Sequence, residues 1–287
     1  MKKFRFLIPV YNDWNNLSRL LKEIDQEIGQ LNYDFEVIVL NDFSSIKHDI
    51  SIKNLKKIKK IKIINFEKNI GNQKAIAIGL KYISKMDDNN EKMIIVLDSD
   101  GQDDPGILNK IIEKNNNSPD QIITINRTTR PEALWFKILY EVHYYTLIFF
   151  SGRKIRYGNY SLISANKLNT LVNSGDLWLA YPAAISKCFK DIKKIFHKRK
   201  QRYSGTSKVN LYKLTIHALK VFSVFKYKVF ISSLIYSMIF LFLGKNFHFF
   251  IYIILLANIL IFGVSLNSKK KFEVNFESII KNVETIN

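Results

Sequence analysis

The chain has 287 residues, a net charge of +19 and 47% hydrophobic residues. This length suits one domain of about 200 residues with an apolar appendage. So positive a charge suits nucleic acid, an anionic bilayer or a phosphorylated substrate, but an Ile-, Asn- and Lys-rich composition produces the same bias, so charge alone selects no partner. A single cysteine, Cys188, excludes an intrachain disulfide and a thiolate metal site.

Apolar runs alternate with amphipathic segments through the first half of the chain. We expect buried strands over 4–10, 35–40, 61–66, 93–97 and 121–126, and helices over 14–29, 72–84 and 107–114. This order predicts an α/β domain with a largely parallel sheet, in which ligands bind at the carboxyl ends of the strands. The first apolar run is short and breaks at Pro9, which predicts no signal peptide and a domain that stays in the cytoplasm.

The second half is richer in long apolar segments. Residues 132–150 predict an aromatic helix, either in the core or in the bilayer interface. Residues 229–243 and 247–266 predict a membrane hairpin, the alternatives being a buried helical pair or a dimer interface. Lysines at 220, 226 and 228 and at 269–271 place both hairpin ends in the cytoplasm. We therefore divide the chain into a catalytic domain, 1–220, and a hairpin with a short cytoplasmic tail, 221–287.

The segment after the fourth expected strand is the sharpest candidate site. Alternate residues at a strand end point the same way, so that Asp98, Asp100 and Gln102 converge on one ion. Hard cations such as Mg²⁺ or Mn²⁺ prefer oxygen ligands and leave room for phosphate oxygens and water. A cation held there would neutralise a diphosphate leaving group.

Five segments together resemble the family 2 glycosyltransferases, within the branch of the dolichyl-phosphate mannose synthases and bacterial polyprenyl-phosphate glycosyltransferases. They are Ile8–Asn12, Val39–Ser45, Asn69–Ala75 with Gly79 beyond it, Asp98–Pro105 and Arg202–Lys208. The resemblance implies a GT-A (Rossmann-like) fold, a nucleotide-sugar donor, Mg²⁺ or Mn²⁺, and inversion at the anomeric carbon.

The resemblance also implies roles for single residues. Those expected to bind substrate are Pro9, Tyr11, Asn12, Asn41, Asp42, Gln73, Lys74, Asp98, Ser99, Arg127, Arg130 and Lys208. Asp98, Asp100 and Gln102 would hold the metal, and Asp100, Asp103 and Arg202 are the expected catalytic residues. Arg202 and Lys208 would face the diphosphate or the acceptor phosphate, because cationic side chains suit phosphate oxygens.

Two positions depart from the family pattern. Asn41 stands where relatives have an acid; its oxygen still accepts a hydrogen bond from a nucleobase N–H, so base preference is the property in question. In Gly158–Leu162 the expected Arg is Ser161, which leaves the acceptor open.

The acceptor hypotheses differ in their need for a general base. A sugar hydroxyl needs one, and Asp103 and Asp176 are candidates, whereas an ionised lipid phosphate does not. We favour transfer to polyprenyl phosphate or another lipid-linked acceptor at the inner membrane face. The alternatives are a transferase that extends a surface glycan, and a catalytically silent membrane scaffold. We expect no nucleic-acid partner, and leave a homo-oligomer open.

Overall fold

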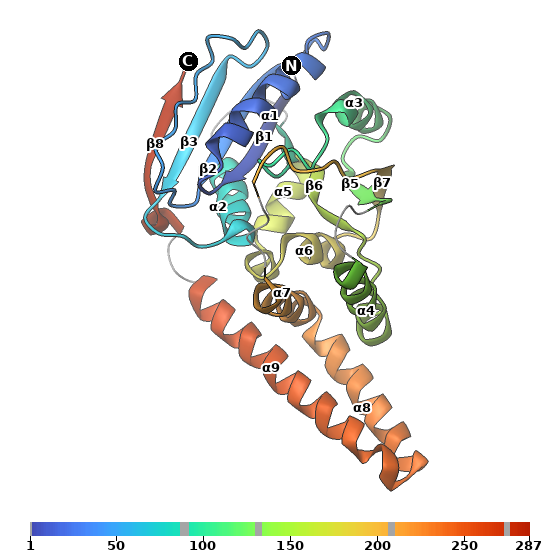
Figure 1. The fold of residues 1–287 in the computed structure, drawn as a ribbon. Coiled ribbons are helices and arrows are strands. Elements are labelled where there is room, and N and C mark those ends of the chain that lie inside the picture. The colour runs from blue at the N-terminus through green and yellow to red at the C-terminus, as the bar shows by residue number, and fades with distance from the viewer. Residues whose placement is uncertain (1, 87–91, 130–133, 206–209, 273–275) are drawn as a thin grey trace.

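The computed structural model describes residues 2–86, 92–129, 134–205, 210–272 and 276–287. Its centre is an eight-stranded sheet in the order β7-β5-β6-β4-β1-β2-β3-β8 (Figure 1). The strands are β1 (Lys3–Val10), β2 (Asp34–Asn41), β3 (Lys60–Phe66), β4 (Lys92–Val96), β5 (Ile122–Arg127), β6 (Tyr157–Ser164), β7 (Ile192–His197) and β8 (Ile280–Ile286). Strands β4, β1, β2 and β3 run parallel, whereas β6 and β8 pair antiparallel with their neighbours.

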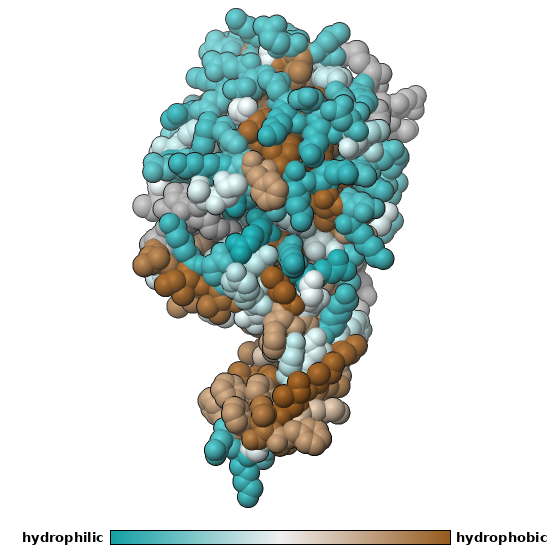
Figure 2. Space-filling view, turned by 90° about the vertical axis from the view of Figure 1, so that its right-hand side faces the viewer, coloured by the Kyte–Doolittle hydropathy of each residue, from teal (hydrophilic) through white to brown (hydrophobic). Residues whose placement is uncertain are grey.

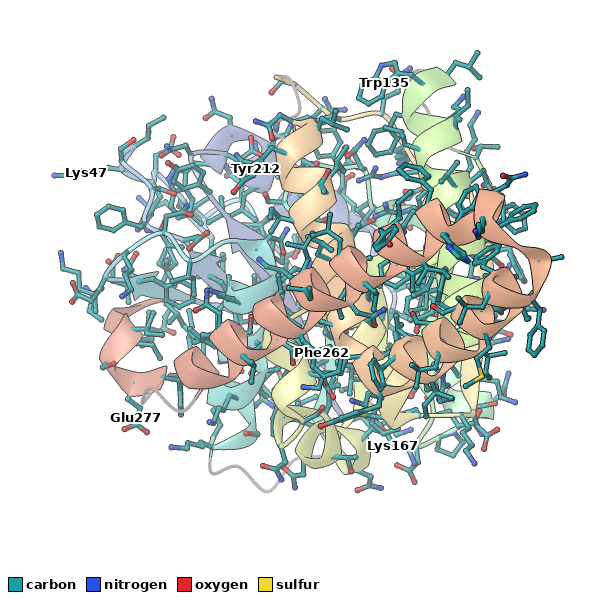
Figure 3. The ribbon with its side chains drawn as sticks, turned by 90° about the horizontal axis from the view of Figure 1, so that it is seen from below. Lys47, Trp135, Lys167, Tyr212, Phe262 and Glu277 are labelled. Carbon is teal, nitrogen blue, oxygen red and sulfur yellow. The ribbon has the colours of Figure 1, made fainter. Side chains whose placement is uncertain are left out.

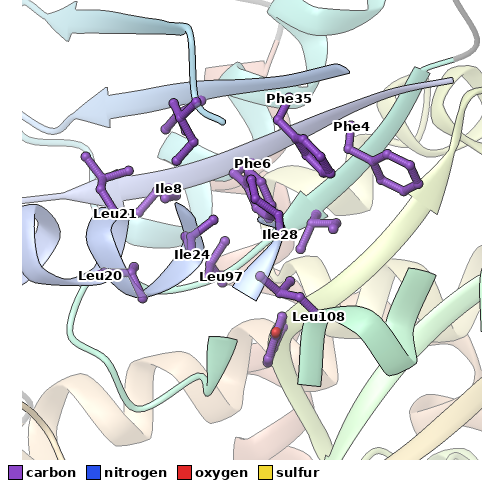
Figure 4. Close-up of a cluster of buried hydrophobic side chains, with 14 of the residues drawn as sticks. Phe4, Phe6, Ile8, Leu20, Leu21, Ile24, Ile28, Phe35, Leu97 and Leu108 are labelled. Atoms are coloured by element: carbon purple, nitrogen blue, oxygen red, sulfur yellow. The ribbon is translucent and has the colours of Figure 1, made fainter. Parts of the chain in front are cut away.

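One face of the sheet is covered by α1 (Trp14–Glu27) and α3 (Leu108–Asn117). Apolar residues recur along α1 at helical spacing, so Leu17, Leu20 and Ile24 all turn toward the strands. They meet a layer that includes Phe4, Phe6 and Ile8 (Figure 4). This layer fixes the carboxyl ends of β1 and β2, where the site lies.

The opposite face is covered by α2 (Asn72–Ser84), α5 (Ala165–Val172) and α6 (Tyr181–Cys188). Helix α2 lies close against the sheet at Gly79. A Cβ there would come within 2.7 Å of Leu7 and 2.8 Å of Leu40, closer than side-chain atoms approach one another. Glycine at this position therefore lets the helix backbone approach β1 and β2.

A third apolar cluster joins this domain to the remaining helices: α4 (Leu134–Ser151), α7 (Leu211–Val224), α8 (Lys226–Leu243) and α9 (His248–Phe272). Helices α8 and α9 form an antiparallel hairpin that projects from the domain (Figure 1). Two segments, Lys226–Leu243 and Lys245–Ser268, are long and apolar enough to cross a membrane. The projecting part is mostly hydrophobic on its surface, whereas the opposite part of the molecule is mostly hydrophilic (Figure 2).

The structure contains the five expected strands and the expected helices, with small shifts at their ends. Strands β6, β7 and β8 were not predicted. The C-terminus differs from the short cytoplasmic tail that we expected. After the hairpin the chain returns to the sheet, where strand β8 pairs with β3. The unpaired edge of β3 accepts this last strand, which closes the edge.

Helix α4 lies beside α8 and leaves an apolar row exposed. Phe149 stacks on Tyr236 of α8 at 4.1 Å, while Trp135, Ile138, Val142 and Tyr145 face outward. In the view from below, Trp135 lies at the outer end of α4 and Tyr212 near the start of α7 (Figure 3). A core helix would bury such a row, so this exposure favours the interface alternative for α4.

Candidate active site

The loops after β1 and β2 are joined by side-chain hydrogen bonds. The Oδ1 atom of Asn12 accepts from the backbone N–H groups of Ser45 and Ile46, at 2.8 and 3.1 Å. The backbone N–H of Asn12 donates to Oγ of Ser44. Asn12 therefore shapes this edge of the sheet. Tyr11, expected to line the base, follows Pro9 at the strand end and is 42% exposed.

Asp42 supports the next loop. Its carboxylate accepts from the backbone N–H groups of Ile70 and Gly71, at 2.7 and 2.9 Å. Burial raises the pKa of this carboxyl above its usual value, although those two N–H groups and the charge of Lys74 lower it. Asp42 therefore positions the loop that opens α2.

Two acids at the end of β4 lie close to each other. Oδ1 of Asp98 accepts from the carboxamides of Asn72 and Asn159, at 3.1 and 3.0 Å. Asp100 is 9% exposed, and its Oδ1 accepts from the backbone N–H of Gln102. Burial, followed by the charge of Asp98, raises the pKa of the Asp100 carboxyl. A buried carboxylate with a second carboxylate beside it forms a site for positive charge.

Arg202 supplies positive charge to these acids. Its guanidinium donates to Oδ2 of Asp100 at 2.9 Å and to Oδ2 of Asp13. The same loop packs Tyr203 over Gly101, whose φ of 80° makes a turn that L side chains rarely adopt, and a Cβ there would collide with the tyrosine ring. The 202–205 loop thus closes over the acidic turn, from a distant part of the sequence.

Asp103 lies beneath this turn. It is buried, accepts from the backbone N–H of Asp98 at 3.0 Å, and pairs with Arg127 at 3.5 Å. Burial, followed by the charge of Asp98, raises the pKa of Asp103 to about 6. Its buried contacts suit a group that holds Asp98 and Arg127 in place better than a base that meets a substrate hydroxyl.

Gln73 and Asn159 link the site to the helical layer. The carboxamide of Gln73 donates to Asn159 and accepts from the backbone N–H of Tyr181, each within 2.9 Å. Lys74 lies over the Trp178 ring, 5.7 Å from its centroid. Asp176, the other candidate base, pairs with Lys187.

The remaining expected site residues are Ser99, Gln102, Arg130 and Lys208. Ser99 is buried in the turn between Asp98 and Asp100. The backbone carbonyl of Gln102 accepts from Lys200 N–H, so its place in the turn is fixed. Arg130 and Lys208 lie outside the described residues. The roles assigned to all these residues stay predictions.

Sequence reasoning did not assign a role to Asn159 or to Asp13. Asn159 lies in the segment that departs from the family pattern, which was the available signal. Asp13 carried none, because its partner, Arg202, is 189 residues away in the sequence.

The acidic turn fits a hard divalent cation. No group of three or more His, Cys, Asp or Glu side chains suited to a metal occurs among the described residues. Mg²⁺ commonly uses one or two carboxylates and takes its other ligands from substrate phosphates and water. The expected ligands Asp98 and Asp100 are two such carboxylates, and the third expected ligand, the amide oxygen of Gln102, follows them in the same turn.

The chain is similar in sequence to known glycosyltransferases. The profile described as "Glycosyl transferase family 2" matches residues 6–205. An uncharacterized glycosyltransferase of Synechocystis sp., sll0501, is 24% identical over 74% of this chain and 66% of its own length. Undecaprenyl-phosphate 4-deoxy-4-formamido-L-arabinose transferase of Klebsiella pneumoniae is 27% identical over 48% of this chain and 40% of its own. The match thus spans less than two thirds of each relative.

The fold has counterparts among solved structures. A crystal structure of glucosyl-3-phosphoglycerate synthase from Mycobacterium tuberculosis, in complex with Mn²⁺, uridine diphosphate and phosphoglyceric acid, superposes with a TM-score of 0.55. It shares 13% identity and covers 79% of this chain and 78% of that one. This likeness confirms the expected GT-A fold.

Proposed function

Because this chain belongs to glycosyl transferase family 2, we propose that it transfers a sugar, with inversion, from a nucleotide-sugar to polyprenyl phosphate at the cytoplasmic face of a membrane. The proposal rests on two features that occur together in this chain. A pair of acids that suits a cation lies at the carboxyl edge of the sheet, and two apolar helices project from the same domain.

The acidic turn supports the donor half of the proposal. A divalent cation bound by Asp98, Asp100 and Gln102 would supply positive charge next to the departing diphosphate. Arg202 already neutralises Asp100, so its guanidinium lies close to that position. Planar guanidinium forks bind phosphate oxygens in pairs, which suits Arg202 to the leaving group.

The surface supports the lipid half of the proposal. The outward row on α4 and the hairpin α8–α9 would hold the domain against a bilayer, with α4 in the interface. The lysines at 220, 226 and 228 and at 269–271 flank the apolar segments, and this pattern supports a domain on the cytoplasmic side. The Klebsiella pneumoniae relative is named for an undecaprenyl-phosphate acceptor, which agrees with this arrangement.

A phosphate acceptor also agrees with the buried state of Asp103. A phosphate oxygen is already ionised at neutral pH and attacks without a general base. Asp103, the candidate base nearest the acidic turn, is 4% exposed and accepts from Asp98 N–H. The burial of Asp103 therefore supports an acceptor that brings its own charge.

The test is a donor panel on membranes that contain the protein. Radiolabelled UDP- and GDP-sugars are supplied with polyprenyl phosphate and Mg²⁺ or Mn²⁺, using the wild type, Asp100→Asn and the exposed control Asp191→Asn. We expect metal-dependent label in an organic-extractable lipid for the wild type and the control, and a loss of about 100-fold or more for Asp100→Asn. Label in a water-soluble glycan would show that the acceptor is a glycan and not polyprenyl phosphate. Inactivity with every donor would contradict the proposal.

A further inference from the structure

Four polar side chains from four segments form a continuous chain at the edge of the sheet. Asn41 ends β2, Asn65 lies beside it on β3, Glu284 belongs to β8, and His48 comes from the loop after β2. Nδ2 of Asn41 donates to Oδ1 of Asn65 at 2.7 Å, and Nδ2 of Asn65 donates to Oε1 of Glu284 at 2.6 Å. The other carboxylate oxygen of Glu284 lies 3.0 Å from Nε2 of His48.

The two ends of this chain fix the direction of every amide in it. At one end, the backbone N–H of Ser44 donates to Oδ1 of Asn41 at 3.0 Å, and an N–H group only donates. At the other end, an ionised Glu284 only accepts. The Asn41 oxygen must therefore face the 43–46 loop, and its NH₂ group must face β3. Reversing either amide would set two donors or two acceptors against each other.

We propose that Glu284 determines which nucleobase the donor site accepts, by holding the Asn41 amide in this direction; this inference rests on the nucleotide-sugar donor proposed above. The 43–46 loop lies at the carboxyl edge of the parallel strands, where ligands bind in such sheets. A base at that edge meets the oxygen of Asn41, which has a second lone pair.

An oriented acceptor distinguishes bases by their ring nitrogen. Uracil and guanine present a ring N–H beside a carbonyl, which donates to the Asn41 oxygen. Cytosine and adenine present an unprotonated ring nitrogen beside an amino group, the reverse pattern. A site that hydrogen-bonds one of these patterns leaves its polar groups unpaired when a base with the other pattern binds. A freely turning amide would accept both patterns. The Ser44 N–H holds the Asn41 amide at one end and the Glu284 carboxylate, through Asn65, holds it at the other, so Glu284 contributes to the selectivity as a positioning residue.

The role proposed for Glu284 gives a function to strand β8, which returns to the sheet after the hairpin. Glu284 pairs in the sheet with Ile63, and its side chain reaches Asn65 on the same face. His48, the last member of the chain, packs against the buried Trp14 ring in a tilted arrangement with centroids 5.2 Å apart. The C-terminal strand thereby contributes to a site whose other residues lie near the N-terminus.

The experiment measures nucleotide binding by the full-length purified protein. Dissociation constants are compared for UDP against CDP, and for GDP against ADP, since the members of each pair differ in this hydrogen-bonding pattern. Glu284→Gln keeps the shape of the side chain but lets its amide donate as well as accept. Glu277→Gln, which removes a carboxylate paired with Lys85 in the same C-terminal segment, is the matched control.

We expect the wild type to prefer the base with the ring N–H, and Glu284→Gln to reduce that preference about tenfold with an unchanged melting temperature. Glu277→Gln should keep the preference. In an Asn41→Asp background, where both side-chain oxygens accept, Glu284→Gln should have no effect. An unchanged preference in Glu284→Gln, or a wild type that prefers CDP or ADP, overturns the inference alone. A wild type that binds none of the four nucleotides overturns the proposed donor as well.

Discussion

Arg202 is the residue through which distant parts of the chain meet at the acidic turn. It contacts Asp100 and Asp13 with separate nitrogens of one guanidinium and donates from Nε to the backbone carbonyl of Ser204. Three donors in one plane are a geometry that lysine lacks. Arg202 therefore orients the loop and the acid together, in addition to supplying charge.

Replacing Arg202 with lysine separates these two contributions. Arg202→Lys keeps a positive charge but removes the fork, so we expect kcat to fall about 100-fold because one ammonium group cannot hold Asp100, Asp13 and the loop carbonyl of Ser204 together. Steady-state kinetics with the preferred donor measure this. A kcat within about threefold of the wild type would show that charge alone is enough.

A second residue-scale prediction concerns stability. Arg5 is fully buried and pairs with the buried Glu36 at 2.9 Å. Burial raises the pKa of Glu36, but the Arg5 hydrogen bond and the charges of Lys3, Lys62 and Arg5 outweigh it, so the pKa is lowered overall. Glu36→Gln removes the carboxylate charge that Arg5 pairs with and should lower the free energy of unfolding by about 3–5 kcal/mol.

The sign of the pH dependence follows from that lowered pKa. A carboxyl with a lowered folded-state pKa contributes its full stability above the unfolded value of about 4.5 and loses it as the pH falls below that value. Chemical denaturation at pH 7 and pH 4 should therefore show a smaller gap between wild type and Glu36→Gln at pH 4. An equal gap at both values would contradict the assignment.

At the scale of elements, α2 depends on its close approach to the sheet. Gly79→Val inserts atoms where Leu7 and Leu40 already lie, so we expect the free energy of unfolding to fall by about 1–3 kcal/mol. Gly175→Val is the control, because no atom lies within 4 Å of the added Cβ there. Thermal or urea unfolding of both variants gives the comparison, and equal losses would mean that packing at α2 is not the cause.

The elements that sequence reasoning found are those with an apolar run or a clear helical period. Strand β2 (Asp34–Asn41) is apolar in its buried part except for Glu36, so it was expected nearly to the residue. In strand β7 the adjacent Lys193 and Lys194 interrupt the apolar residues, and β8 is almost wholly exposed. Their strand state comes from pairing with β5 and β3, a long-range contact that local pattern does not encode.

The candidate site was predicted from the sequence about as completely as the secondary-structure elements were. The acidic turn and its place at the end of β4 followed from residue type and spacing. The partners of those acids did not, because Asn159 and Arg202 reach Asp98 and Asp100 only after the chain has folded. Asn12 and Asp42 were expected to bind the donor, and the structure adds backbone contacts by which they shape its loops.

At the scale of the whole molecule, the proposal requires the bilayer to cover α4. Trp135 is 56% exposed on its outward row, whereas Trp14 and Trp178 are buried. In vesicles of brominated lipid, we expect tryptophan fluorescence to be quenched, because Trp135 would lie at the headgroup level. Trp135→Phe should remove most of this quenching, and quenching that persists in that variant would place another tryptophan, not α4, at the lipid.

The central claim is that the acceptor supplies a phosphate oxygen. We would measure transfer by the purified protein in vesicles that contain either polyprenyl phosphate or the polyprenol of equal length, with the preferred donor and Mg²⁺ or Mn²⁺. The account predicts a glycosyl phosphate product, identified by mass spectrometry, with the first acceptor and less than about 1% of that rate with the second, since a hydroxyl needs a general base and the candidate Asp103 is buried against Asp98 and Arg127. Comparable transfer to polyprenol would contradict it.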